Sequence, residues 1–215
     1  MALHARRLLV AVLGGIIAGF MLSGGTTVAL AQPVGYVAAI EGTVLILRAG
    51  EAIPAGEGSV VEVDDRLETG QESRALLVLD DGSRIVIGAD TQVALLFLVD
   101  AGALSGDRVI ELLRGILRIG VHQPDGASSV QTRTPTAVVA ARSTEWIIEY
   151  ADDSTAVLAL EGTVAVTALT AEGTVILEPG EGTDVARGQA PTEPAVWGAA
   201  RAEAARDRTA FGGIR

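Results

Sequence analysis

The chain of 215 residues contains no cysteine and no lysine. Without cysteine it can form neither a disulfide nor a thiolate metal site, and it lacks both a cysteine nucleophile and the acylated cysteine of a bacterial lipoprotein. All 16 basic residues are arginines, against 27 acidic residues, so the formal net charge is −11. This acidic balance disfavours nucleic acid and anionic membrane surfaces as partners.

Aromatic residues and histidines are also few: aromatic residues make up 3% of the chain, and two histidines occur. His122 is the one histidine beyond the N-terminal apolar segment, so it belongs to no site with several histidine ligands. The small number of aromatic rings disfavours a sugar-binding cleft. A glycoside hydrolase stays open as an alternative, because the fold can bring together two carboxylates that are distant in the sequence. The chain has no G-x-S-x-G motif and no phosphate-binding loop. We therefore expect no catalytic residue, no metal and no cofactor.

Three acidic pairs occur along the chain, at 64–65, 80–81 and 152–153. Their oxygens could bind calcium. However, none of the pairs has further ligands at regular spacing nearby, and tight turns also favour aspartate. The sequence therefore favours turns over metal sites at these positions.

The N-terminal segment has the pattern of a secretory signal peptide. Two arginines precede an apolar run of 15 residues at 8–22, which is shorter than the about 20 residues that a membrane span needs. Ala29-Leu30-Ala31 then provides small residues for a processing enzyme. We predict a signal peptide over 1–31, cleaved between Ala31 and Gln32, with an uncleaved anchor as the alternative. The predicted mature chain is periplasmic or secreted, is not inserted in a membrane, and has a formal charge of −13.

The tetrapeptide EGTV occurs at 41–44, 161–164 and 172–175, with looser copies EGSV at 57–60 and EGTD at 181–184. Glycine adopts positive φ at little steric cost, and threonine and valine favour a strand. Each copy therefore predicts a turn followed by a strand. The uneven spacing indicates a recurring turn, with two related halves as a further reading, rather than a regular array.

Short β-branched runs separated by turn residues fill the chain from 34 to 185, and helical periodicity is almost missing there. We predict an all-β domain of many short strands over 32–190, solenoid-like or sandwich-like. Its best hairpin signal is ALLVLDDGSRIVIG at 75–88, where Asp81-Gly82 suits a type I′ turn.

The C-terminal segment at 191–215 differs in composition from the rest. Alanine and arginine dominate residues 192–208, and both favour a helix. We predict a short helix there, with Thr192 as its N-cap.

Trp146 and Tyr150 lie four residues apart on a predicted strand and so share one face. On the surface they would form a protein-contact patch, because Trp and Tyr are enriched in hot spots. In the core their polar atoms would be hydrogen-bonded. The sequence favours the core. Arg142 shares this face if the strand is regular, and it then either needs a carboxylate partner within the fold or is presented to an external one.

Longer stretches such as GYVAAIEGTVLILR at 35–48 and VQTRTPTAVVAARSTEWIIEY at 130–150 resemble the FecR domain, from residue 34 to residue 185. Five short family motifs occur in the family's order. They are gD-x-I-x-T-G at Asp65, Thr69 and Gly70; DGS at Asp81 and Gly82; G-x-l-x-V at Gly115; T-P-x-A at Thr134 and Pro135; and eG-x-V at Gly162 and Val164. Gly42 repeats the last motif near the N-terminus, and Arg142-Ser143-Thr144 stands where the family usually has R-G-T. We expect these residues to act in the fold rather than in catalysis.

The resemblance implies an extracytoplasmic all-β domain. The best-known FecR proteins relay a signal from TonB-dependent siderophore receptors to a cytoplasmic sigma factor, and they carry a cytoplasmic helical domain before a membrane span. Here about seven residues precede the apolar run. The resemblance therefore implies a free-standing sensory or protein-interaction module without the cytoplasmic sigma-regulator part. Its expected partner is an envelope protein with a positively charged contact face, and the alternatives are an envelope structural protein or a polymer-processing enzyme.

Overall fold

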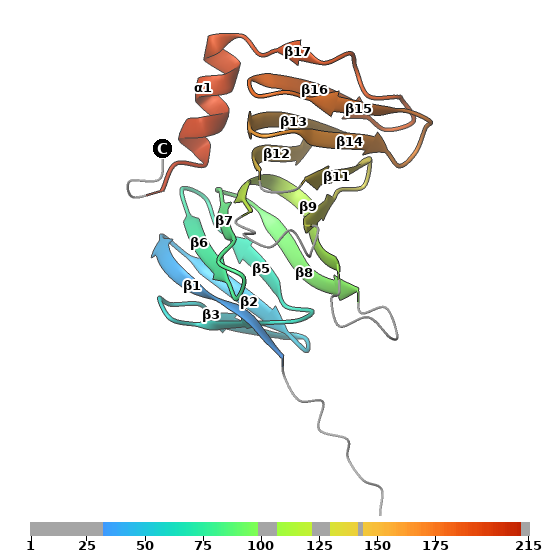
Figure 1. Cartoon of the computed structure of the whole chain (residues 1–215). Coiled ribbons are helices and arrows are strands. Elements are labelled where there is room, and N and C mark those ends of the chain that lie inside the picture. Colours follow the sequence, from blue (N-terminus) through green and yellow to red (C-terminus); the bar gives the residue numbers. More distant parts are fainter. Residues whose placement is uncertain (1–31, 99–106, 122–129, 142–143, 212–215) are drawn as a thin grey trace, which may run out of the picture. The chain divides into compact units, whose positions relative to one another are not determined.

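The computed structural model describes residues 32–98, 107–121, 130–141 and 144–211, and these contain seventeen strands and one helix (Figure 1). The predicted all-β fold with a short C-terminal helix is confirmed. The elements are β1 (Pro33–Glu41), β2 (Val44–Arg48), β3 (Glu51–Pro54), β4 (Val60–Glu62), β5 (Arg66–Thr69), β6 (Arg74–Leu79), β7 (Arg84–Ile87), β8 (Gln92–Leu98), β9 (Asp107–Gly120), β10 (Val130–Arg133), β11 (Ala137–Ala141), β12 (Glu145–Ala151), β13 (Ser154–Glu161), β14 (Val164–Ala168), β15 (Thr174–Leu177), β16 (Glu181–Ala186), β17 (Ala195–Val196) and α1 (Ala199–Arg208).

The strands form two sheets that share β9. Sheet A has the order β4-β1-β6-β7-β9-β12-β13-β16-β17. Sheet B has the order β3-β2-β5-β8-β9-β10-β11-β14-β15. Up to Arg114, β9 pairs in sheet B, and from Gly115 onward it pairs in sheet A. Apart from β9 with β10, the described pairs are antiparallel.

The inner faces of the two sheets enclose a single main core. Strand β6 alternates buried and half-buried residues, so that Ala75, Leu77 and Leu79 point inward. Val37 of sheet A and Leu67 of sheet B join the same buried cluster. Since a fully buried Leu or Val contributes about 1.5–3 kcal/mol, this shared core holds the two sheets together as a sandwich.

Two copies of EGTV occupy equivalent corners of this sandwich. At Gly42, with φ of +74°, the chain passes from β1 in sheet A to β2 in sheet B. At Gly162, with φ of +67°, it passes from β13 in sheet A to β14 in sheet B. In both copies the valine is the first buried residue of the next strand (Val44 and Val164). The unit β1–β4 and the unit β13–β16 then follow the same path, with two strands in sheet B between two in sheet A.

The EGTD copy is not a turn. It forms the start of β16, and Gly182 does not have a positive φ. A Cβ atom on Gly182 would collide with the indole of Trp197. Glycine is therefore required here for close approach of a ring rather than for backbone freedom.

The turn between β6 and β7 differs from the predicted type I′ turn. Gly82 has φ of +82°, but Asp81 does not have a positive φ, whereas a type I′ turn needs positive φ at both central residues. The Gly82 N–H donates to Leu79 O (3.0 Å) and the Leu79 N–H to Ser83 O (2.9 Å). The hairpin thus uses a longer loop that ends in a left-handed glycine.

The helix α1 begins at Ala199, later than predicted, and the residue before it is Gly198 rather than Thr192. Its buried residues Ala202 and Ala205 pack against the outer face of sheet A, on Ile116, Ile147 and Leu158. Thr192 instead exchanges hydrogen bonds with β16. Within the described ranges, no helix has both the length and the hydropathy that crossing a membrane requires.

Candidate interaction surface

Asp65 closes the edge of sheet A. Its carboxylate is 1% exposed and accepts bonds from Arg48, from Nε to Oδ1 (2.8 Å) and from Nη2 to Oδ2 (2.6 Å). It also accepts the N–H of Glu62 (2.8 Å). Nη2 of Arg48 donates in addition to the carbonyl of Val60 (3.0 Å). The motif aspartate therefore joins the last residue of β2, in sheet B, to the end strand β4 of sheet A.

Thr69, Gly70 and Gly115 fix the corners at which the chain changes sheet. The hydroxyl of Thr69 donates to Gly88 O (2.6 Å) and accepts the N–H of Thr91 (3.0 Å). The N–H of Gly70 donates to Thr43 O (3.1 Å). Gly115 has φ of +96° and lies against Thr91, so that a Cβ atom would approach the Thr91 Cα to 2.6 Å. The crossing of β9 from sheet B to sheet A takes place at this glycine.

The other described motif residues also lie in turns or in the core. Oδ1 of Asp81 accepts the N–H of Ser83 (2.8 Å). The hydroxyl of Thr134 accepts the N–H of Ala137 (2.9 Å) across Pro135. Thr144 is buried. Arg142, Ala31 and His122 lie outside the described residues.

Trp146 and Tyr150 point into the core, as the sequence favours. The expectation that both polar atoms are bonded is wrong for Trp146, whose buried Nε1 has no hydrogen-bond partner among the described residues. The hydroxyl of Tyr150 donates to Oδ1 of Asp153 (2.9 Å), and Arg187 donates to both groups (3.3 Å and 2.8 Å). Burial, and then the bond to Asp153, raises the pKa of Tyr150, while the positive charge of Arg187 opposes the rise. The hydrogen bond from Arg187, followed by that from Tyr150, lowers the pKa of Asp153.

The acidic pairs lie at turns. Asp64 has φ of +66°, and Asp152 and Asp153, with φ of +49° and +58°, form the two-residue turn between β12 and β13. Among the described residues, no three His, Cys, Asp or Glu side chains gather as a metal ion would require. Turn chemistry accounts for these aspartates, since aspartate tolerates the left-handed region better than most residues.

Each sheet has two end strands, which are the places where a further strand could pair. In an antiparallel strand, alternate residues bond the neighbour and the others face outward. In β4 the outward residues are Val60 and Glu62: Arg48 bonds the carbonyl of Val60, and Asp65 bonds the N–H of Glu62 through its carboxylate and the carbonyl of Glu62 through its own N–H (3.2 Å). Three of the four outward backbone groups of β4 are therefore bonded within the chain.

The opposite edge of sheet A and one edge of sheet B are also blocked. Beyond β16, Thr192 accepts the N–H of Asp184 at its hydroxyl (3.0 Å) and returns its own N–H to Asp184 O (3.0 Å), while Gly182 pairs with Ala195 of β17. In β3 the outward residues are Ala52 and Pro54. Proline has no N–H, so β3 presents one outward donor.

The remaining end strand, β15, is open. The N–H of Ala168 donates to Gly173 O (3.0 Å), so the outward residues of β15 are Thr174 and Ile176. In the part of the chain that the structure describes, the backbone N–H and C=O groups of these two residues have no hydrogen-bond partner. The Ile176 side chain is 51% exposed.

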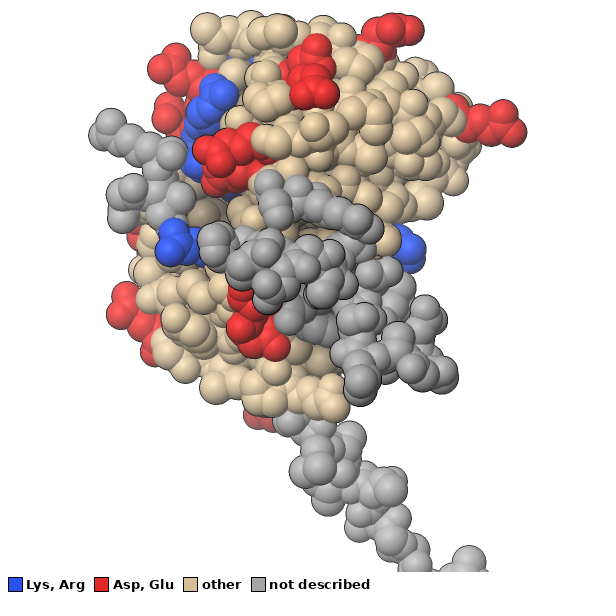
Figure 2. Space-filling model, viewed as in Figure 1, with Lys and Arg blue, Asp and Glu red and all other residues tan. Residues whose placement is uncertain are grey.

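Acidic side chains cover several places on the face shown in Figure 2, and arginines are fewer. Residues 32–90 contain eleven carboxylates and four arginines. The exposed apolar residues Tyr36 and Val60 are direct neighbours on β1 and β4. The described surface thus combines negative charge with small exposed apolar groups.

Two crystal structures of a protein from Parabacteroides distasonis ATCC 8503, described as a proposed anti-sigma factor, are similar to this chain. Each has a TM-score of 0.53 and 18% sequence identity over 65% of this chain, which shows a shared fold. The match spans 63% of one of these structures and 62% of the other, which is less than two thirds of their length. No curated protein matches the chain.

A family comparison matches residues 65–165 to the family described as FecR protein. The match begins at Asp65 and ends in β14, so it is narrower than the range 34–185 over which the motifs resemble the family. It includes the five motifs, while β1–β4 and the elements from β15 to α1 lie outside it. Residues 65–165 of this chain therefore form a FecR domain.

Proposed function

We propose that the chain is a non-catalytic, extracytoplasmic sensory or protein-interaction module of the FecR type. Residues 1–31 direct export, and cleavage between Ala31 and Gln32 leaves the domain in the periplasm or outside the cell. The apolar run at 8–22 and the small residues at 29–31 support this processing.

The FecR domain at 65–165 is the observation that carries the proposal. The shared fold with a protein described as a proposed anti-sigma factor supports a regulatory role in signalling. The motif residues support the same reading, because Asp65 and Thr69 have all their observed contacts inside the fold. They hold corners and edges in place, and the binding surface is left to other residues.

The proposed partner is a protein of the cell envelope with a positively charged contact surface. The predicted mature chain has a net charge of −13 and no lysine. Complementary charge acts mainly on the association rate and weakens as salt rises. The acidic segment 32–90 supports this charge preference.

Capture experiments on the exported protein test the proposal. The full chain is expressed with its own N-terminal segment, recovered from the envelope fraction and immobilised, and envelope proteins are passed over it at low and high ionic strength. We expect one or a few proteins to be retained, with association rates that fall as salt rises. Failure to retain any envelope protein would contradict the interaction role. Hydrolysis of peptidoglycan by the purified chain, lost on substitution of a single carboxylate, would overturn the non-catalytic part.

A further inference from the structure

We infer that the open edge of β15 accepts an extended segment of the partner protein as an additional strand of sheet B. This inference rests on the proposed protein-interaction function and names the surface and the kind of partner segment. Strand addition at a sheet edge is a general mode of peptide recognition, in which main-chain hydrogen bonds provide affinity and side chains provide selectivity.

The contrast among the four end strands is the first argument. Three of the four outward groups of β4 are bonded within the chain, Pro54 removes a donor from β3, and the end strand β17 has two residues and follows Pro194. Such devices protect natural sheets against pairing with other chains. In the described part of the chain, β15 is the end strand without one, since Thr174 and Ile176 offer two N–H and two C=O groups outward.

The side chains of β15 hold this edge in position. Leu177 is fully buried in the core, and Val175 packs against the same core cluster. The alternate residues Thr174 and Ile176 are exposed. Because the inward residues fix the strand, an incoming segment meets a preformed edge and does not have to order it.

The outer face of sheet B defines the residue type that would lie beside Ile176. Cross-strand neighbours place Ala140, Ala165 and Ile176 in one row across β11, β14 and β15. The two alanines are small, so the exposed Ile176 is the largest apolar group of this row. An apolar residue of the partner strand would extend the row and cover Ile176, as direct cross-strand pairs do in sheets.

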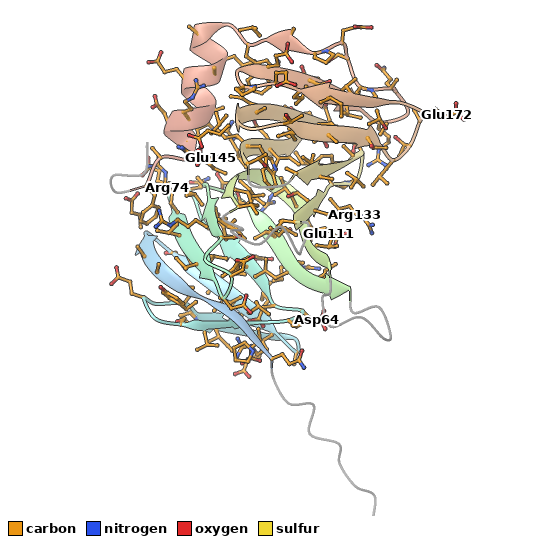
Figure 3. All side chains as sticks on the ribbon, in the orientation of Figure 1. Asp64, Arg74, Glu111, Arg133, Glu145 and Glu172 are labelled. Carbon is orange, nitrogen blue, oxygen red and sulfur yellow. The ribbon has the colours of Figure 1, made fainter. Side chains whose placement is uncertain are left out.

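Charge at the two ends of β15 selects the partner. Glu172 precedes the strand, Glu178 follows it, and both are exposed. Figure 3 shows Glu172 at the outer tip of the hairpin between β14 and β15. A partner segment with Lys or Arg at both ends would pair with these carboxylates. A second copy is disfavoured, because antiparallel pairing of two β15 strands centred on Val175 would place Glu172 of each copy opposite Glu178 of the other.

Amide hydrogen exchange of the purified full-length chain tests the inference with a defined probe. The probe is a synthetic peptide that alternates Thr and Val and has a Lys at each end. We expect the peptide to slow the exchange of the Thr174 and Ile176 amides by about tenfold or more, as a new ladder of hydrogen bonds would. Unchanged exchange at both amides, or protection at Ala52 of β3 instead, would overturn the inference.

Variants on the two edges of sheet B provide matched controls. Ile176→Pro removes an outward N–H and leaves the bonds to β14, whereas Ala52→Pro removes an outward N–H from β3. We expect the first variant to lose peptide binding and the second to keep it. Equal binding by both would contradict the β15 assignment.

A charge reversal keeps the test valid if a proline variant fails to fold. The double variant Glu172→Lys with Glu178→Lys should lose the Lys-ended peptide and gain a matching peptide with Glu at both ends. Retained preference for the Lys-ended peptide would refute the charge argument.

Protection that depends on protein concentration without peptide would identify a second copy as the occupant. Capture of an envelope protein that Ile176→Pro leaves unchanged would reject the edge but retain the proposed function.

Discussion

Arg48, the last residue of β2, bonds to Asp65, the residue before β5, at one edge of the sandwich through two hydrogen bonds, of 2.8 Å from Nε to Oδ1 and 2.6 Å from Nη2 to Oδ2. The carboxylate is 1% exposed and the arginine side chain 31% exposed, so the pair is partly removed from water. The same two side chains bond the carbonyl of Val60 and the N–H of Glu62, which face outward from β4. Arg48 also forms an ion pair with Glu62 of β4, from Nη1 to Oε1 (2.6 Å). The two ion pairs of Arg48 thus link β2 to β4 and engage groups through which β4 could pair with another chain.

The substitution Asp65→Asn should destabilise the fold. It removes one of the two carboxylates that Arg48 contacts, leaving Glu62, and gives the partly buried guanidinium weaker acceptors at Nε and Nη2. We expect a loss of about 2–3 kcal/mol in the free energy of unfolding. Urea unfolding of Asp65→Asn and of the neighbouring control Asp64→Asn measures this. Asp64 is exposed and has a positive φ that asparagine tolerates, so the control should stay close to wild type. Similar midpoints for the two variants would show that the pair does not stabilise the edge.

The substitution Gly82→Val should also destabilise the fold, through the backbone alone. A Cβ atom at Gly82 meets nothing within 4 Å, but φ is +82°. Valine avoids this region, and we expect a cost of about 1–3 kcal/mol. Gly56→Val is the matched control, since its Cβ also meets nothing and its φ is not positive. If urea unfolding finds the same midpoint for both, strain at the left-handed glycine is not the cause.

The turn between β12 and β13 should gain stability from a glycine. Asp152 is exposed and has φ of +49°. A residue with a Cβ atom is strained in this left-handed region, and this strain costs more free energy than the extra conformational entropy that glycine loses on folding. We expect Asp152→Gly to stabilise the fold by about 0.5 kcal/mol. Glu57→Gly, at an exposed position without a positive φ, should have the opposite sign. A thermal or urea midpoint that falls for Asp152→Gly would contradict this account of the turn.

Tyr150 should ionise at higher pH than an ordinary tyrosine. The chain contains two tyrosines, so Tyr36→Phe leaves Tyr150 as the one reporter of phenolate absorbance. Burial and the bond to Asp153 raise its pKa above the usual value of about 10. Because Arg187 opposes this rise, Arg187→Gln should move the titration midpoint higher still. A midpoint at the ordinary value, or one that falls in Arg187→Gln, would contradict the observed contacts.

The same cluster determines the pH dependence of stability. A raised pKa of Tyr150 in the folded state means that its contribution is fully present below about pH 10 and is lost as the pH rises through the folded-state pKa. The lowered pKa of Asp153 has the opposite consequence, since its contribution is present above about pH 3.9 and is lost as the pH falls through its folded-state pKa. Urea midpoints measured from neutral to acid pH should fall less in Arg187→Gln than in the wild type, because the substitution removes the hydrogen bond that is the first cause of the lowered pKa of Asp153.

Local chemistry made much of the fold predictable. The lack of helical period and the β-branched runs indicate an all-β chain, and Gly42 and Gly162 mark turns because positive φ is a property of the residue itself. The limits of the helix and the type of the turn at Gly82 were wrong. Both depend on contacts beyond the local stretch: Thr192 is engaged by β16, and the loop between β6 and β7 includes Asp80 and Ser83.

The sequence alone determined the strand content, the left-handed corners, the acidic charge and the family motifs, because these follow from the residue types and their order along the chain. The tertiary structure decided which strands lie at the ends of the sheets. Arg48 and Asp65 lie 17 positions apart, and their bond depends on two strands that meet in space. Likewise, TVIL at 174–177 reads like any other short strand. Its outward N–H and C=O groups are open because β14 pairs with one side of it and no other described strand reaches the other side. Such pairing between distant segments is a property of the folded chain.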